Sequence, residues 1–262
     1  MEILENHINN YENTKAGNNY IFHEFTARTN SIPYLRAHRD YIEKHNLGFG
    51  ERAFQYMWYL IIKHICTHNL SGNVLEIGVF KGQIISLWKL ISKMENLDIK
   101  VNGITPLEGN SSPKIGLLKS ILFKFSSKFR ENSMSGNFYL KENYLQIIDE
   151  VFNHFELDID TINILKGYST DLNIYKAVEN EKFSLIYIDG DHTFEGVTKD
   201  INMYASLVEK GGFLVMDDAA CNIPGNDFWK GHQSVSDACK IIDALPFRNV
   251  LNVGHNRIYQ KN

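Results

Sequence analysis

Four aspartates stand at the ends of two short apolar runs in the second half of the chain. Asp189 and Asp191 follow the first run, and Asp217 and Asp218 follow the second. Carboxylates gathered in one place repel one another, so they require either shared protons or a bound cation. Oxygen ligands in this number suit Mg²⁺ or Ca²⁺ better than zinc. The alternative is that two of the four cap a helix or face solvent in a turn.

A histidine beside the first acidic pair could act as a base. His192 follows Asp191 directly. An imidazole has an unperturbed pKa of about 6.5, which suits proton transfer near neutral pH. A divalent cation and a base together could activate a weakly acidic hydroxyl group as a nucleophile. The alternative is that His192 only caps the helix that follows it.

These residues come together only if the segment forms a βαβ unit. Apolar runs over 185–188 and 213–216 are typical of strands buried on both faces. Between them, apolar residues recur every three or four positions over 193–209, which predicts a helix that ends at 210–212. The two strands are then parallel, and both acidic ends lie at the carboxyl edge of one sheet, where such folds bind ligands.

A second candidate site follows the first predicted strand. The stretch 74–82 reads VLEIGVFKG, and its glycines Gly78 and Gly82 allow the backbone to approach a ligand closely. Glu76 can accept hydrogen bonds from a ligand amine or hydroxyl. The next predicted strand ends at Thr105, where nucleoside-binding folds often place an acidic residue for ribose hydroxyls. A threonine hydroxyl binds such groups more weakly than a carboxylate does.

Strands and helices alternate along the rest of the chain, which predicts a doubly wound α/β sheet. A third strand is expected over 161–165, and a terminal hairpin over 250–260. We expect two parts. Residues 1–72 form a loose polar arm and a helical cap, and residues 73–262 form the main domain with a helical insertion at about 107–142.

The insertion carries apolar residues interleaved with lysines. Three interpretations are open for it: a lid over the acceptor site, a contact surface for an anionic acceptor or a membrane, and a packed helix with a solvated basic face.

Two histidines on a predicted helix have a spacing that can bind metal. His64 and His68 lie four residues apart, but no adjacent glutamate completes a zinc-protease pattern. We therefore expect both to be ordinary surface residues.

Bulk composition limits the classes of function. The 262-residue chain has a formal net charge of −4, which gives no general reason to expect nucleic acid as a partner. Cys66, Cys221 and Cys239 lie far apart, so we expect reduced thiols and a cytoplasmic protein. The first residues have no signal-peptide pattern, and no apolar run is long enough to span a membrane.

Several motifs together resemble those of class I S-adenosylmethionine-dependent methyltransferases. They are LEIGVFKG (75–82), GYSTD (167–171), YIDGDHTFEG (187–196) and GGFLVMDD (211–218). With KGHQSV (230–235) and VGHNR (253–257), they are similar to a branch of metal-dependent sugar O-methyltransferases, which includes macrolide, aminocoumarin and cephalosporin hydroxylase-like relatives. The resemblance implies a Rossmann-like, doubly wound sheet of seven strands with the last strand antiparallel.

The resemblance also implies roles for individual residues. Those expected to bind S-adenosylmethionine are Glu76, Gly78, Gly82, Thr105, Ser169 and Asp189. Thr105 departs from the pattern of the family, because most of these methyltransferases have Asp or Glu at its position. Those implied to hold Mg²⁺ are Asp189, Asp217 and Asp218. The base matches His192 in one set of relatives and Asp191 in another, and this sequence offers both.

Three functions remain in competition. The first is Mg²⁺-dependent transfer of a methyl group from S-adenosylmethionine to a hydroxyl of a sugar or glycan, including anionic or lipid-linked glycans that would bring the protein to a membrane surface. The second is a glycosyltransferase, because Asp189-Gly190-Asp191 also fits a D-x-D metal motif. The third is a non-catalytic partner subunit, supported by Thr105 alone. We also expect a homo-oligomer and no nucleic acid partner.

Overall fold

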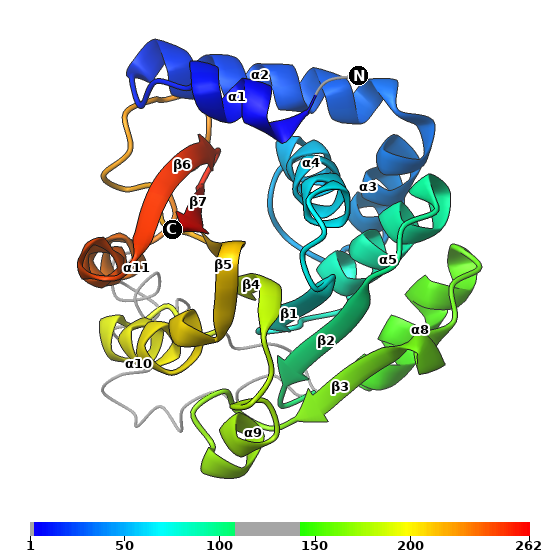
Figure 1. The fold of residues 1–262 in the computed structure, drawn as a ribbon. Helices are drawn as coiled ribbons and strands as arrows, with labels where there is room; N and C mark the ends of the chain where they lie inside the picture. Colours follow the sequence, from blue (N-terminus) through cyan, green and yellow to red (C-terminus); the bar gives the residue numbers. More distant parts are fainter. Residues whose placement is uncertain (1–2, 108–141) are drawn as a thin grey trace, which may run out of the picture.

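The computed structural model describes residues 3–107 and 142–262. They form a seven-stranded sheet with helices on both faces (Figure 1). The strands are β1 (Asn73–Ile77), β2 (Lys100–Thr105), β3 (Ile162–Lys166), β4 (Phe183–Ile188), β5 (Val208–Met216), β6 (Phe247–Val253) and β7 (Asn256–Lys261). Their order is β3-β2-β1-β4-β5-β7-β6, and β7 runs antiparallel to both neighbours. The Rossmann-like, doubly wound sheet with its last strand antiparallel is therefore confirmed.

The pairing of the central strands explains why the acidic residues share one edge. β4 pairs in parallel with both β1 and β5, with Ile188 opposite Ile77 on one side and Met216 on the other. Hydrogen bonds continue one residue beyond this ladder. The N–H of Asp189 donates to the carbonyl of Ile77 at 2.9 Å, and the N–H of Asp217 donates to that of Ile188 at 3.0 Å. The two aspartates therefore leave the sheet side by side.

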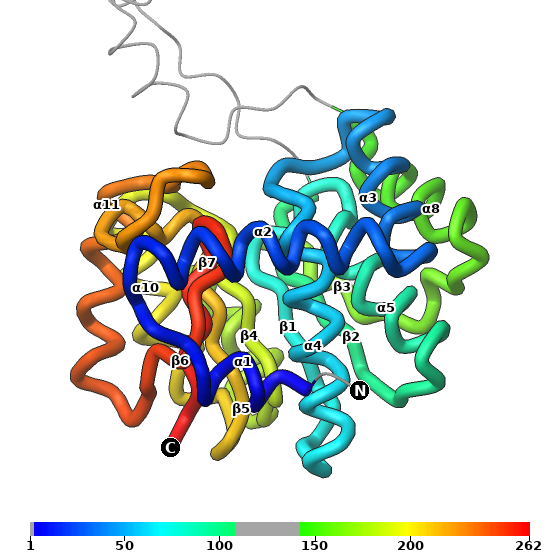
Figure 2. The backbone as a smooth tube through the Cα atoms, turned by 90° about the horizontal axis from the view of Figure 1, so that it is seen from above, coloured from blue at the N-terminus to red at the C-terminus, as the bar shows by residue number. Residues whose placement is uncertain are grey.

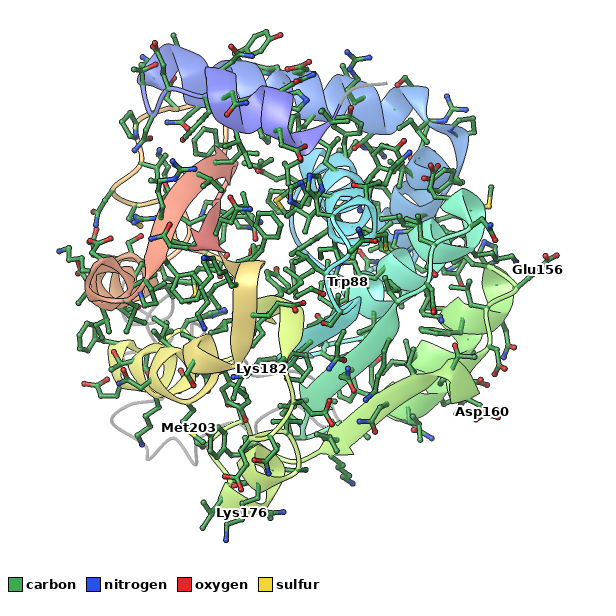
Figure 3. All side chains as sticks on the ribbon, viewed as in Figure 1. Trp88, Glu156, Asp160, Lys176, Lys182 and Met203 are labelled. Atoms are coloured by element: carbon green, nitrogen blue, oxygen red, sulfur yellow. The ribbon has the colours of Figure 1, made fainter. Side chains whose placement is uncertain are left out.

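Side chains of β4 alternate between two hydrophobic cores, as successive strand residues must. Leu185 and Tyr187 face the core that contains α3 (Pro33–His45), α4 (Ala53–Thr67), α5 (Gln83–Glu95) and α8 (Tyr144–His154). Ile186 and Ile188 face the core that contains α9 (Leu172–Lys176), α10 (Phe194–Tyr204) and α11 (Gln233–Ala238). Figure 3 shows Trp88 of α5 inside the first core, where it is fully buried.

The N-terminal arm is not loose, so that prediction is wrong. It forms α1 (Leu4–Asn10) and α2 (Lys15–Ser31), and both helices pack across α4 and β6 (Figure 2). Ile21 and Phe25 of α2 are buried, as is Leu4 of α1. The hydroxyl of Tyr11 donates to Asn18 at 2.6 Å and accepts from the side-chain amide of Asn252 at 2.6 Å. A few buried contacts thus hold a segment whose overall polarity suggested an unattached arm.

The predicted end of the helix between β4 and β5 is also wrong. α10 ends at Tyr204, and a 3-10 turn, η2 (Ala205–Leu207), leads directly into β5. Gly211 has a φ of 82°, and a Cβ on Gly212 would lie 2.9 Å from the carbonyl oxygen of Ser184. The pairing of β4 with β5 shifts register at this point. These glycines therefore form an irregularity within β5 rather than the end of the helix.

The helical insertion predicted at 107–142 lies outside the described residues apart from its two end residues. Its helical character and its role stay predictions, as does the domain boundary at residue 72. Within residues 3–107 and 142–262, no helix combines the length and the apolar character needed to cross a membrane.

Candidate active site

A cavity of ≈ 1000 Å³ opens at the carboxyl edge of the sheet. The loops after β1 to β5 form most of its wall, and the residues before α4 and the turn between β6 and β7 complete it. Its volume lies at the upper end of the range of small-molecule sites. Of the predicted site residues, only Gly82 does not line it.

Three carboxyl groups and three imidazoles meet on one side of the cavity. His232 Nε2 lies 3.6 Å from Asp218 Oδ2, and its ring stacks on that of His192. His192 Nε2 lies 3.2 Å from Asp218 Oδ2 and 3.9 Å from Asp189 Oδ1. His255 Nε2 lies 3.4 Å from Asp217 Oδ1 and 3.6 Å from Asp218 Oδ1. The structure therefore brings the three predicted metal ligands together with one predicted base.

A kink after β5 allows two successive aspartates to face the cavity. Successive residues of a regular strand point to opposite faces. Asp218 instead has a φ of 53°, a left-handed conformation that Asp and Asn adopt more readily than most residues. Its carbonyl accepts a hydrogen bond of 2.8 Å from the N–H of His232, and the N–H of Ala219 donates to the carbonyl of His255 at 2.8 Å. These bonds hold the kink.

Burial and mutual repulsion set the protonation of the carboxyl groups. Burial, and then the charge of Asp217, raise the pKa of Asp218 to about 8 and that of Asp189 well above its usual value. Burial also opposes ionisation of Asp217, but His255 beside it outweighs this effect and the pKa of Asp217 falls to about 2. Among the three carboxyl groups, the one beside His255 therefore ionises most readily, and the other two keep their protons to higher pH.

The same residues suit a divalent cation. The approach of His255 to Asp217 lacks hydrogen-bond geometry, so Oδ1 of Asp217 is buried with no hydrogen-bond partner among the described residues. A cation at this oxygen would satisfy it and would displace the protons of the neighbouring carboxyl groups. Three aspartates are a donor set that Mg²⁺ accepts. Their arrangement fits the ion, and the ion itself stays a prediction.

The two candidate bases lie in different surroundings. Asp191 is exposed, and its Oδ1 accepts a hydrogen bond of 2.7 Å from the N–H of Thr193 at the start of α10. The side chain of His192 is 16% exposed and faces Asp218. Thr193 caps α10, because its hydroxyl accepts a hydrogen bond from the N–H of Gly196 at 3.1 Å. The interpretation of His192 as only a helix cap is therefore wrong.

Two residues of this wall, His255 and Glu51, were not among the predicted site residues. Oε2 of Glu51 lies 3.9 Å from His255 Nδ1, and its Oε1 accepts a hydrogen bond of 3.2 Å from the N–H of Trp229. Burial lowers the pKa of His255, but Asp217, Asp218 and Glu51 outweigh it and raise the pKa. His255 belongs to the motif VGHNR, which was part of the resemblance to the methyltransferases. The contact of His255 with Asp217, however, depends on the pairing of β7 with β5.

Glu76 and the turn after β1 form another part of the wall. Glu76 is 3% exposed, and burial raises its pKa to about 8. Its Oε2 has no hydrogen-bond partner within the described part of the chain. A ligand ammonium group would satisfy this oxygen and draw the proton from the carboxyl group.

The two glycines of this turn have different roles. Gly78 has a φ of 101°, and a Cβ there would lie 2.1 Å from the carbonyl oxygen of Asp189. Gly78 therefore lets the turn after β1 pack against the turn after β4. Gly82 has a φ of 82° and begins α5, outside the wall of the cavity.

Thr105, Ser169 and Asp200 also line the cavity. The hydroxyl oxygen of Thr105 accepts a hydrogen bond of 3.1 Å from the N–H of Leu107. One acceptor position of this hydroxyl is therefore already occupied by the backbone of the turn. The hydroxyl of Ser169 donates to Oδ1 of Asp200 at 2.6 Å. Asp200 was not predicted; it is 1% exposed, and burial raises its pKa to about 6. The cavity therefore contains a buried acid that α10 supplies, whereas none comes from the end of β2.

Aromatic side chains also line the cavity, and one of them lies next to the histidines of the acidic cluster. Trp229 is 51% exposed, and its ring lies 5.4 Å from that of His232 and 5.1 Å from that of His255. Phe49 is 68% exposed and stacks on Phe80 at 5.6 Å. Exposed aromatic faces of this kind can pack against a ring-shaped ligand.

Comparison with known proteins agrees with this arrangement. A family model described as a methyltransferase domain matches residues 75–219, more than half of the chain. An uncharacterized protein of Acanthamoeba polyphaga mimivirus is 28% identical over 146 residues, which are 55% of this chain and 50% of that protein. The chain thus matches about half the length of this curated relative.

Solved structures of methyltransferases share the fold. The O-methyltransferase NovP is 16% identical, with 79% of each chain covered and a TM-score of 0.54. CalS11, described as a TDP-rhamnose 3′-O-methyltransferase of calicheamicin biosynthesis, is 12% identical over 91% of this chain and 93% of that one, with a TM-score of 0.53. An O-methyltransferase from Bacillus cereus in complex with SAH is 14% identical over 87% and 90%, with a TM-score of 0.51.

The match of the family model includes the glycine turn after β1, the acidic turn after β4 and the aspartate pair after β5. These are the same segments that suggested a class I methyltransferase. The chain therefore belongs to the methyltransferase domain family.

Proposed function

We propose that this protein is a metal-dependent O-methyltransferase that transfers the methyl group of S-adenosylmethionine to a hydroxyl group of a sugar. The observation that carries the proposal is the buried Oδ1 of Asp217, which lacks a hydrogen-bond partner among the described residues. It lies in a cluster with two further carboxyl groups, in the cavity that contains the glycine turn of the methyltransferase family.

Glu76 and Ser169 would hold the two ends of S-adenosylmethionine. The unsatisfied Oε2 of Glu76 suits the ammonium group of the amino acid end. Ser169 would contact the adenosine, with its hydroxyl oriented by the hydrogen bond to Asp200. Thr105 and Asp189 line the same cavity and would complete the cofactor side.

Asp189, Asp217 and Asp218 would hold a divalent cation next to the acceptor. When bound, such a cation lowers the pKa of a hydroxyl that it contacts and orients vicinal hydroxyls. The contact of His255 with Asp217 and Asp218 supports this role, because it fixes the position of both carboxyl groups.

His192 would be the general base. Its Nε2 lies 3.2 Å from Asp218, whose carboxylate would stabilise the imidazolium that forms. In the reaction, the acceptor oxygen bonds to the methyl carbon while the carbon–sulfur bond breaks. The sulfonium becomes the neutral thioether of S-adenosylhomocysteine, and the hydroxyl proton passes to His192. Asp191 has less support as the base, because it is exposed and bonded to the start of α10.

A sugar acceptor is supported by two observations. CalS11 is described as acting on TDP-rhamnose, and this chain shares its fold. The aromatic faces of Trp229 and Phe49 offer packing surface for a sugar ring at the edge of the cavity. The sequence-based expectations of an anionic or lipid-linked glycan and of a homo-oligomer stay predictions.

Calorimetry with S-adenosylhomocysteine, first with Mg²⁺ and then with EDTA, tests the cofactor and the ion. We expect binding in both conditions and a separate heat for Mg²⁺. A panel of nucleotide-linked and free sugar diols is then screened by mass spectrometry for a gain of one methyl group. Absence of S-adenosylhomocysteine binding by the folded protein would contradict the proposal. Methyl transfer at full rate in EDTA would show that the reaction needs no metal ion, and the metal-dependent part of the proposal would then be wrong.

The two other functions expected from the sequence have less support. The second carboxyl group of the D-x-D pattern, that of Asp191, is bonded to the start of α10 instead of facing the cluster. The argument for a non-catalytic subunit depended on Thr105, and Asp200 supplies a buried acid in the same cavity. If the protein binds a nucleotide sugar but does not bind S-adenosylhomocysteine, the glycosyltransferase function would be favoured instead.

A further inference from the structure

A second group of metal-ligating side chains lies at the other end of α4. Phe54, at the start of this helix, lines the cavity, and His64 lies ten residues further along. At 1.5 Å per residue the separation is about 15 Å. His64 and His68 meet Glu5 of α1 there: Glu5 Oε1 lies 3.1 Å from His64 Nδ1 and 2.6 Å from His68 Nε2. The three ligand atoms lie within 4.8 Å of one another.

The orientation of the His68 ring is fixed at its far nitrogen. His68 Nδ1 lies 3.0 Å from the backbone carbonyl oxygen of His64. A carbonyl oxygen can only accept, so Nδ1 carries a hydrogen and Nε2 is the nitrogen that faces Glu5. A carbonyl that fixes the far nitrogen in this way is the usual support of a metal-bound histidine.

His64 presents a buried nitrogen to the same point. The residue is 7% exposed, so the prediction that both histidines lie on the surface is wrong for His64. Its Nδ1 has no hydrogen-bond partner among the described residues, because the approach of Glu5 lacks hydrogen-bond geometry. Its ring stacks on that of His68 with centroids 3.9 Å apart, so both rings border the same space.

Glu5 supplies the negative charge. Burial raises its pKa, but hydrogen bonding to the backbone and the two imidazoles outweigh burial and lower the pKa. A carboxylate oxygen therefore lies beside two imidazole nitrogens. A cation held by these three ligand atoms would neutralise the carboxylate and would give the buried Nδ1 of His64 a partner.

We propose that Glu5, His64 and His68 bind a zinc ion. Two imidazoles and one carboxylate form a zinc donor set of three protein ligands, with a fourth position for water. The side chain of His68 is 48% exposed, which leaves solvent access on that side. Imidazole nitrogens do not suit Mg²⁺ or Ca²⁺, which prefer oxygen ligands, so this site differs in kind from the aspartate cluster.

The ion would fasten α1 to α4. α1 has seven residues, and among them only Leu4 and His7 are buried. Such a short helix has little stability of its own, so a ligand from each helix on one ion would add directly to its attachment. This structural role does not depend on methyl transfer.

The test must separate this site from the cavity. Among the residues that the structure describes there, both groups of possible metal ligands contain Asp218. We therefore start from Asp218→Asn, which preserves the left-handed backbone because Asn tolerates it. The EDTA-treated variant is titrated with Zn²⁺ by calorimetry, and its melting temperature is measured with and without Zn²⁺. We expect one zinc ion per chain. At a free zinc concentration of about 100 times Kd, the melting temperature should rise by about 5 °C.

Adding Glu5→Gln or His68→Ala to this background should weaken zinc binding at least about 100-fold and abolish the rise in melting temperature. His23→Ala is the matched control, because His23 pairs with a single carboxylate, that of Asp227, at 2.7 Å. It should leave zinc binding unchanged. The proposal is wrong if Asp218→Asn binds no zinc, or if Glu5→Gln and His68→Ala bind it as tightly as the His23→Ala control. If Asp218→Asn does not fold, the same comparison in the wild-type chain should show a loss of one zinc ion from the total.

Discussion

Nε2 of His255 lies 3.4 Å from Oδ1 of Asp217, and the two side chains are only 4% and 12% exposed. This contact joins the turn before β7 to the end of β5. It lowers the pKa of Asp217, whereas burial and the charge of Asp217 raise the pKa of Asp189 and of Asp218. Asp217 is therefore the carboxyl group of the cluster that ionises most readily.

Replacement of Asp217 by Asn should remove metal-stimulated methyl transfer. We expect the rate to fall by about 100-fold or more, because a negatively charged ligand of the cation is lost. The affinity for S-adenosylhomocysteine should change less than about threefold, since Glu76 and Ser169 are unaltered. Initial rates over a range of Mg²⁺ concentrations and calorimetry measure the two effects. Asp227→Asn, in an exposed ion pair with His23, is the control. A fully active variant without metal dependence would contradict the assignment.

Substitutions of His192 and Asp191 distinguish the two candidate bases. His192→Gln should lower kcat by about 10²- to 10⁴-fold. The rise of kcat/KM with pH, as the base loses its proton, should also disappear. Asp191→Ala should keep the shape of this pH profile. It should instead reduce the free energy of unfolding by about 1 kcal/mol, because Asp191 bonds to the N–H of Thr193. The reverse outcome would make Asp191 the base.

Binding of the cofactor product should release a proton from Glu76. Burial raises the pKa of Glu76 to about 8, so at pH 7 the free protein holds this carboxyl group mostly protonated. An ammonium ligand favours the carboxylate, and close to one proton per S-adenosylhomocysteine should leave. Release should diminish as the pH rises above about 8, where the free protein is already ionised.

Calorimetry in buffers of different ionisation enthalpy measures this proton count. Glu76→Gln should abolish the release and weaken binding by about 10- to 100-fold, a loss typical of a charge-assisted hydrogen bond. Equal proton release by Glu76→Gln and the wild type would show that another group titrates.

Gly78 and Gly190 line the same cavity but should tolerate alanine differently. Gly78 has a φ of 101°, and an added Cβ would lie 2.1 Å from a backbone oxygen, so Gly78→Ala should cost about 1–3 kcal/mol of unfolding free energy or more. An added Cβ on Gly190 meets nothing closer than 3.6 Å. Gly190→Ala should therefore stay within about 1 kcal/mol of the wild type. Urea unfolding measures both, and equal losses would contradict the packing of the two turns.

Asp200 should make stability depend on pH. Burial raises its pKa from 3.8 to about 6, so the folded state binds this proton more tightly than the unfolded state. Its favourable contribution is complete below pH 3.8 and is lost as the pH rises through about 6, by up to about 3 kcal/mol. Asp200→Asn keeps an acceptor for Ser169 and should remove this loss.

Urea unfolding at pH 4.5 and pH 7.5 tests the linkage of Asp200. The variant Asp200→Asn should gain stability over the wild type at the higher pH. Ser169→Ala should have the opposite effect, because the hydrogen bond from Ser169 lowers the pKa of Asp200. A constant difference between Asp200→Asn and the wild type over this range would be inconsistent with a buried titrating acid.

The aspartate cluster could be predicted from the sequence because its geometry is local. Asp189 and Asp217 each follow a buried strand. When two such strands are parallel neighbours, their carboxyl ends lie side by side, independently of the remaining elements of the fold. The glycine turn after β1 was evident for the same reason. Both depend on contacts within a βαβ unit, whose handedness and direction are fixed by general rules.

Contacts between distant segments could not be predicted in this way. His255 reaches Asp217 only because β7 pairs with β5, and a hairpin by itself does not specify its neighbour in the sheet. Glu5 is 59 residues from His64 in a polar segment that gave no sign of packing on α4. Asp200 looks like any polar residue of an amphipathic helix until Ser169 is placed against it.

The position of β7 between β5 and β6 imposes an order on folding. β6 precedes β7 along the chain, but among the described strands its only hydrogen-bonded neighbour is β7. Until β7 inserts, β5 is an edge strand with unpaired backbone groups, and β6 can be held only by side-chain contacts. When β7 pairs with β5, it also brings His255 next to Asp217. The aspartate cluster would therefore acquire this imidazole partner late in folding. Nascent chains stopped before residue 256 should therefore expose the unpaired, aggregation-prone edge of β5 and lack the contact between His255 and Asp217.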